Sequence, residues 1–329
     1  AVVKIDQKAP VTQVQDEPTA SWVNSQVVLT LDPTDGGVDA GNSAAIVSTY
    51  CVATGAAGSC DPTDTDGTVG DVIGKSVTLD PGDTFEEIYN VYYHSTDTLG
   101  NDETVNTTPV VVRIDRIVPV VSISSPAAGY ITIDNPTLTY TATDNQIDTV
   151  VLTLENITLG TGAQQIFITS GSTLGPLDDG QYELVVTATD LALNQTVQSV
   201  QFTVDTQDPT VTITTPTSAD TTNQTPTLDY ELSDTNLDIS TLVVTLDDGL
   251  GGGPLPISTR DTENLATLGE GTYTLAVSVD DLAGRTGSAS VTFEIDLTDP
   301  SVAINTPASG LSNNNQPTLN YDAADDNLK

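Results

Sequence analysis

The chain has 329 residues, with 8 Lys and Arg against 46 Asp and Glu, and a formal net charge of −38. This acidic excess excludes the basic surface needed to bind nucleic acid or an anionic membrane, and it favours cations as partners. Hydrophobic residues make up 37% of the chain, and no uninterrupted apolar run is long enough to predict a membrane-spanning segment.

A short motif recurs along the chain. It consists of a β-branched apolar residue, an aspartate, three spacer residues and a proline, at positions 5–10, 114–119, 204–209 and 295–300. Over the last three copies the proline recurs after 90 and then 91 residues. A fixed period of this size indicates a tandem array. We interpret each copy as a joint, where the last strand of one domain ends and the next domain begins.

The joints predict five segments. Residues 1–6 form the end of the last strand of a preceding repeat, 7–118 a divergent domain (repeat one), 119–208 repeat two, 209–299 repeat three, and 300–329 the first two strands of an incomplete repeat four. Because the chain opens on a strand end and closes inside a repeat, we expect it to be an internal piece of a longer protein.

Repeat one differs from the others by a long insertion between residues 32 and 83. The insertion contains the chain's two cysteines, Cys51 and Cys60, and the chain's single histidine is His94. With so few soft ligands, a disulfide is favoured over a metal site. Two free buried thiols are the alternative.

Repeats two and three align strand by strand. Short alternating runs follow the joint proline at 120–125, 210–215 and 301–306, and second runs lie at 136–140, 226–230 and 317–321. Further strands are expected at 150–154 and 242–246, at 180–186 and 271–277, and at 200–204 and 291–295. Such strands, separated by Gly, Pro, Asn and Asp, predict an all-β fold of sandwich domains.

Several stretches resemble a known family. Gly180-Gln181-Tyr182 and Gly271-Thr272-Tyr273 are similar to the tyrosine corner of immunoglobulin-like sandwiches. With the joint at 204–209 and the stretch 188–194, repeats two and three resemble bacterial immunoglobulin-like repeats of large surface proteins and adhesins, and repeat one resembles a related extracellular type through 22–24 and 95–101. The resemblance implies tandem immunoglobulin-like β-sandwiches in an extended array, in an extracellular or cell-surface protein.

In such a sandwich, the loop after the second strand and the loop before the last strand lie at the same end, beside the preceding joint. The second-strand loops carry Asp144, Asp234 and Asp325, and the last loops carry Asp97, Asp190, Asp280 and Asp281. The joints themselves carry Asp6, Asp115, Asp205, Asp208, Asp296 and Asp299.

Crowded carboxylates repel one another unless a cation lies between them. Oxygen ligands without Cys or His favour Ca²⁺, so we predict Ca²⁺ at one or more joints. The joints at 205–209 and 296–300 are the better candidates, because Asp208 and Asp299 add a second acid there. The joint at 115–119 has Ile117 and Val118 instead, and we expect apolar packing to hold it. The alternative is that these aspartates are ordinary turn residues.

The leading functional hypothesis is a non-catalytic stalk or spacer of a long, adhesin-like extracellular protein, with joints stiffened by Ca²⁺. One alternative is a subunit of a self-assembling filament, sheath or surface layer, whose partners are other copies of the chain. Another is a glycan- or protein-binding module in residues 7–118. We expect no enzyme, and we interpret the acid pairs at 86–87 and 178–179 as solvated turns.

Overall fold

The computed structural model describes residues 5–36, 46–56, 59–63, 72–73, 76–83, 85–105, 107–219, 222–258, 260–307, 309–310 and 313–325. Most of the strand end predicted at 1–6 lies outside these residues. The chain divides into a first compact unit, made of 1–128, 135–175 and 180–202, and a second, made of 129–134, 176–179 and 203–329. Throughout the described residues the structure consists of strands and turns without helix, which confirms the predicted all-β class and leaves no helix long and apolar enough to cross a membrane.

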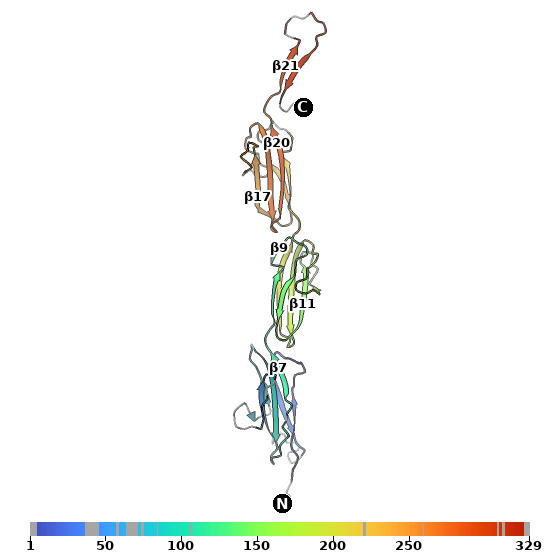
Figure 1. The fold of residues 1–329 in the computed structure, drawn as a ribbon, viewed down its shortest axis with the longest axis vertical. Helices are drawn as coiled ribbons and strands as arrows, with labels where there is room; N and C mark the ends of the chain where they lie inside the picture. Colours follow the sequence, from blue (N-terminus) through green and yellow to red (C-terminus); the bar gives the residue numbers. More distant parts are fainter. Residues whose placement is uncertain are drawn as a thin grey trace. The chain divides into compact units, whose positions relative to one another are not determined.

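Repeat one contains two sheets (Figure 1). The apolar faces of these sheets share one core. One sheet has the order β1-β2-β5, from Val11–Gln15, Val27–Thr34 and Ser76–Leu79. The other has the order β4-β3-β6-β7, from Val72–Ile73, Val47–Thr54, Glu86–Thr96 and Val110–Asp115. Alternate residues of each strand point inward, so that Leu29, Leu31, Val91 and Ile114 are all fully buried.

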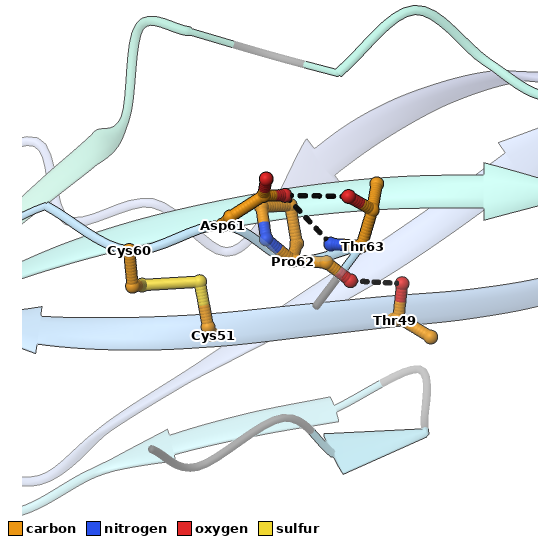
Figure 2. The surroundings of a disulfide bond; sticks show 6 residues. All are labelled: Thr49, Cys51, Cys60, Asp61, Pro62 and Thr63. Carbon is orange, nitrogen blue, oxygen red and sulfur yellow. Dashed lines mark hydrogen bonds between the residues drawn. A yellow bond between two sulfur atoms is a disulfide. The ribbon is translucent and has the colours of Figure 1, made fainter. Parts of the chain in front are cut away.

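The predicted disulfide between Cys51 and Cys60 is confirmed (Figure 2). It joins β3 to the segment that follows it. Beside the bond, the Thr49 hydroxyl donates to the carbonyl of Pro62 at 2.8 Å, and the Asp61 carboxylate accepts from the amide and hydroxyl of Thr63. The hydrogen bonds from Thr63 hold the pKa of Asp61 below its usual value. The disulfide therefore anchors the segment that follows β3 to the sheet.

Repeat two follows the same plan of two sheets. β8 (Val120–Ser125) pairs with β10 (Thr139–Thr143), and the facing sheet has the order β12-β11-β13-β14, from Gln164–Ile166, Ile147–Asn156, Gly180–Asp190 and Gln195–Val204. The ring of Tyr182 stacks on Phe202 with centroids 5.6 Å apart. In the second unit, β9 (Gly129–Ile131) meets the end of β14 through the amide of Asp205, which donates to the carbonyl of Ile131 at 2.9 Å.

Among the described residues, repeat three has counterparts of β8 and of β10 to β14. β15 (Thr210–Thr215) pairs with β16 (Asp229–Ser233), and the other sheet has the order β18-β17-β19-β20, from Leu255–Pro256, Leu237–Asp247, Gly271–Asp281 and Thr286–Ile295. The hydroxyl of Tyr273 donates to the carbonyl of Gly269 at 3.2 Å. This is the tyrosine-corner bond that the sequence pattern predicts.

The second strand of each repeat starts later than predicted. In repeat two the strand begins at Thr139, although Leu138 is fully buried. The Leu138 amide donates to Ser172 and its carbonyl accepts from Gly171, so the backbone before the strand bonds to another loop and not to β8. Leu228 does the same with Glu263 and Thr262.

Repeat four is present as a hairpin. β21 (Ser301–Thr306) pairs with β22 (Asn320–Ala324), in the register seen between β15 and β16. Its apolar residues, buried or partly buried in repeat three, are exposed here: Leu228 is 0% exposed and its counterpart Leu319 is 62% exposed.

Candidate metal centres

Aspartates from distant parts of the sequence meet at three places. Among the described residues, each group offers carboxylate oxygens that lie within 4.8 Å of one another. We call them the first triad (Asp6, Asp35 and Asp97), the second triad (Asp115, Asp144 and Asp190) and the third triad (Asp205, Asp234 and Asp281). The first two belong to the first compact unit and the third to the second unit.

Each triad draws one aspartate from each of three elements. In the second triad, Asp115 ends the last strand of repeat one, Asp144 follows β10 and Asp190 ends β13. In the third triad, Asp205 follows β14, Asp234 follows β16 and Asp281 ends β19. The joint and both predicted loops therefore contribute, as the repeat pattern predicts, and no single loop builds a triad alone.

The last-loop aspartates are held by the same turn in each repeat. Asp97, Asp190 and Asp281 each accept a hydrogen bond from the backbone amide four residues later, at 2.8, 2.9 and 2.9 Å. A residue in the left-handed region closes each turn, with φ of 85° at Gly100, 69° at Leu193 and 81° at Gly284. This shared geometry fixes where each carboxylate points.

The joint and second-strand aspartates close tighter turns. Each accepts the amide two residues later: Asp115 from Ile117 at 2.8 Å, Asp205 from Gln207 at 3.4 Å, and Asp144 and Asp234 likewise. The interpretation as ordinary turn residues is therefore correct for one oxygen of each carboxylate. These turns leave the second oxygen of each carboxylate to other contacts, as at Asp205, whose Oδ2 accepts the side-chain amide of Asn236.

Two of these second oxygens are buried without a protein partner in the described structure. They are Oδ2 of Asp115, whose residue is fully buried, and Oδ2 of Asp281, whose residue is 3% exposed. A buried carboxylate oxygen with no donor is costly. A cation between the carboxylates removes that cost, and the donor set of these triads fits such an ion.

The electrostatic surroundings of the second triad also favour a bound cation. Burial raises the pKa of Asp115 to about 6, and the charges of Asp190, Asp144 and Glu86 add to this, while the hydrogen bond from the amide of Ile117 opposes it. At the first triad, burial also acts against ionisation of Asp97. There, hydrogen bonds from Asn101 and from the amides of Leu99 and Gly100 outweigh burial and hold the pKa of Asp97 below its usual value.

Apolar packing does not hold the joint at 115–119, contrary to the prediction. Ile117 and Val118 remain 39% and 52% exposed, and with Val120 and Asp144 they line an open groove of about 330 Å³. The contacts here are polar instead. Glu86 accepts hydrogen bonds from the side-chain amides of Asn145 and Gln146, at 3.0 and 2.8 Å.

Two predicted ligands are turned away from the third triad. The Asp208 carboxylate pairs with Nε of Arg285 at 2.7 Å. Asp280 neighbours Asp281 on β19, and adjacent strand residues face opposite sides of a sheet. Its carboxylate accordingly accepts the hydroxyl of Thr286 at 2.6 Å.

The joint at 296–300 shows no such group in the part of the chain that the structure describes. Asp296 closes its turn with the amide of Thr298 at 3.0 Å, and Asp299 is exposed. Neither comes together with Asp325 in a group of three potential ligands. At the other joints the third carboxylate comes from the loop before the last strand, and the hairpin has no such loop. Calcium binding by Asp296, Asp299 and Asp325 stays a prediction.

Sequence reasoning missed three acidic residues that matter here. Asp35 follows β2 as Asp144 follows β10, and the shared signal is a hydroxyl residue directly before the aspartate (Thr34 and Thr143). Glu86 and Asp179 both stand three residues before the repeat tyrosine. The sequence predicts solvated turns for both, yet Glu86 bonds across the joint and Asp179 accepts the amide and hydroxyl of Thr206.

The triads suit a hard cation. Carboxylates in loops, with groove space for water beside the second triad, match the 6–8 oxygen ligands and loose geometry of Ca²⁺ better than the strict octahedron of Mg²⁺. The protein would supply three carboxylates, and backbone carbonyls and water would complete the shell.

Comparison with known proteins bears on the fold. Residues 123–206 match the family model described as a bacterial Ig-like domain. No curated protein sequence matches the chain.

Among solved structures, the chain is similar to a tetra-tandem repeat in the extending region of a large adhesion protein (17% identity, 91% of this chain and 77% of that one, TM-score 0.34). It is also similar to the fibronectin(III)-like modules of Clostridium thermocellum CbhA (18% identity, 54% and 94%, TM-score 0.28). A third is the N-terminal part of the bacteriophage RB49 outer capsid protein Hoc (12% identity, 88% and 99%, TM-score 0.36). These likenesses concern the fold and not the function. The predicted resemblance is borne out for repeat two: residues 123–206 match the bacterial Ig-like domain family, in a chain whose fold is a tandem array of immunoglobulin-like β-sandwiches.

Proposed function

We propose that this chain is a non-catalytic spacer segment of an extracellular, adhesin-like protein, and that Ca²⁺ bound at the aspartate triads stiffens its joints. The observation that carries the proposal is the meeting of three aspartates at the second and third triads, each with a buried carboxylate oxygen that lacks a protein partner in the described residues. Turn formation alone leaves these oxygens unexplained.

The cation would act by tying a joint to the repeat that follows it. At the second triad it would link Asp115, at the end of repeat one, to Asp144 and Asp190 of repeat two. Among the described residues, side-chain hydrogen bonds between these repeats involve Glu86, which accepts from Asn145 and Gln146, and Asn194, which donates to the carbonyl of Asp115. Because small contacts between domains permit motion by default, the ion would decide how freely this joint bends.

The repeats themselves would not need the ion to fold. Their cores contain stacked Tyr and Phe rings and buried Leu and Val side chains, as in repeat two and repeat three. Calcium would therefore control the joints more than the sandwiches. This separation suits a spacer, which must keep its length while its stiffness responds to the surroundings.

The proposal is tested on the full chain with thermal unfolding and small-angle scattering, in Ca²⁺ and in chelator. We expect a higher melting temperature in Ca²⁺ and a narrower distribution of chain dimensions. A ligand bound only by the folded state, at 100 times its dissociation constant, adds about 2.7 kcal/mol. Identical melting curves and identical scattering in the two buffers would refute the proposal.

A further inference from the structure

The second and third triads differ at one position that decides their hydrogen bonding. Asn194 and Arg285 both lie four residues after the last-loop aspartate, and both donate their backbone amide to it. The side-chain amide of Asn194 also donates to Oδ2 of Asp190 at 2.8 Å and to the carbonyl of Asp115 at 2.9 Å. In place of that amide, repeat three has a guanidinium group.

Arg285 turns to the joint instead of to the aspartate that its amide binds. Its Nε donates to the Asp208 carboxylate at 2.7 Å, and its side chain is 30% exposed. Oδ2 of Asp281, which has lost the counterpart of the asparagine amide, is the oxygen left without a partner in this described region. In the same triad, Oδ2 of Asp205 does have a partner, because the side-chain amide of Asn236 donates to it at 2.8 Å.

The second triad differs in which carboxylate oxygen lacks a partner and in how its neighbouring arginine is bound. Gln146, at the position of Asn236, donates to Glu86, which leaves Oδ2 of Asp115 as the oxygen without a partner among the described residues. Arg116, next to Asp115, is bound by Asp80 and Asp83 at 3.2 and 2.9 Å. Position 118 is Val, so this joint has no counterpart of Asp208.

We propose that Arg285 is a built-in counter-cation that weakens calcium binding at the third triad relative to the second, so that the two sites fill at different calcium concentrations. The inference rests on the proposed calcium sites. Arg285 acts in two ways: it places a positive charge beside the triad, and it holds Asp208, a further carboxylate, away from the ion.

The size of the effect follows from Coulomb's law in a partly hydrated site. A neighbouring unit charge in high dielectric is worth on the order of a three- to tenfold change in affinity. Because Arg285 and Asp208 are partly exposed, added salt should reduce the difference. Graded sites would let the joints stiffen one after another as calcium rises.

The test is a calcium titration of the full chain by calorimetry. Asp97→Asn and Asp190→Asn together remove one carboxylate from each of the first and second triads. The titration of this double variant then measures calcium binding at the third triad. On this background Arg285→Met should tighten binding by about three- to tenfold. Arg285→Lys, which keeps the charge, and Arg260→Met, which makes the same charge change on another loop, should each stay within about twofold.

Melting curves in chelator verify that each variant is folded, and the same Arg285→Met change in the otherwise unaltered chain provides a second reading as a shift of the weaker binding transition. Unchanged or weaker binding in Arg285→Met, with calcium still bound by the unaltered chain, overturns the inference and leaves the proposed function standing. Failure of the unaltered chain to bind calcium overturns both.

Discussion

Replacing Asp281 by asparagine is expected to have opposite effects in calcium and in chelator. The Oδ1 of Asp281 accepts the amide of Arg285, and an asparagine can keep this bond. Its Oδ2 is buried and has no protein partner in the described structure, and its carboxylate group lies near those of Asp205 and Asp234. The substitution therefore removes charge repulsion from the apoprotein and a ligand from the calcium form.

The magnitudes follow from the geometry. Two unit charges no more than 4.8 Å apart repel by about 3 kcal/mol or more at an effective dielectric constant of about 20. Solvent screening reduces this, and we expect Asp281→Asn to stabilise the chelated protein by about 1 kcal/mol. In calcium at 100 times the dissociation constant, the unaltered triad gains about 2.7 kcal/mol, and a variant that binds 10–100 times more weakly gains about 0.4–1.4 kcal/mol.

Thermal unfolding of the full chain in both buffers measures the reversal. One kcal/mol corresponds to about 4–8 °C for a domain of 60–100 residues, so both shifts are large enough to resolve. Asp248→Asn is the matched control, because Asp248 closes an exposed turn of the same repeat with the amide of Leu250. If Asp281→Asn lowered the melting temperature equally in both buffers, Asp281 would be a structural turn residue and no ligand.

Three further predictions concern the joints and turns. Burial raises the pKa of Asp115 to about 6, above its value in the unfolded chain, so this group stabilises the apoprotein at low pH and the contribution is lost as the pH rises through 6. In chelator, the free energy of unfolding of the unaltered chain, relative to that of Asp115→Asn, should therefore fall between pH 4.5 and 7.5. A difference that stays constant over this range would contradict the assignment. A Cβ at Gly287 would collide with the carbonyl of Pro209, so Gly287→Ala should destabilise repeat three by about 1–3 kcal/mol in denaturant unfolding, where an unchanged midpoint would show that the joint does not pack there. Leu193 has a φ of 69° and is 74% exposed, so Leu193→Gly should stabilise repeat two by about 1 kcal/mol in the same assay, and a loss of stability would mean that the Leu side chain has an unrecognised contact.

The fold could be predicted because each repeat shows its strands and joints as local patterns of residues. Alternating apolar residues ending in Phe202 and Val204, or in Phe293 and Ile295, place one face of each last strand in a core. The repeated joint sets where each sandwich begins. At Leu138 the backbone bonds to another loop and not to β8, and the sequence pattern does not predict this change of hydrogen-bond partner.

The triads were predicted in outline for the same reason, since equal spacing implies equal position in equal folds. The pattern could not say which neighbouring acids would join them. Asp208 stands one residue before the joint proline, yet Arg285, 77 residues later, binds it. Asp280 is excluded by strand alternation, and Asp35 lies in the repeat whose insertion obscures the alignment. Such pairings depend on side chains that meet only in the folded chain.

Crystals of the full chain grown with calcium, with anomalous scattering recorded at long wavelength, test the central claim most directly. We predict an anomalous peak among Asp115, Asp144 and Asp190 and another among Asp205, Asp234 and Asp281, each within about 2.3–2.6 Å of carboxylate oxygens. Triads that contained only water in millimolar calcium would contradict the account.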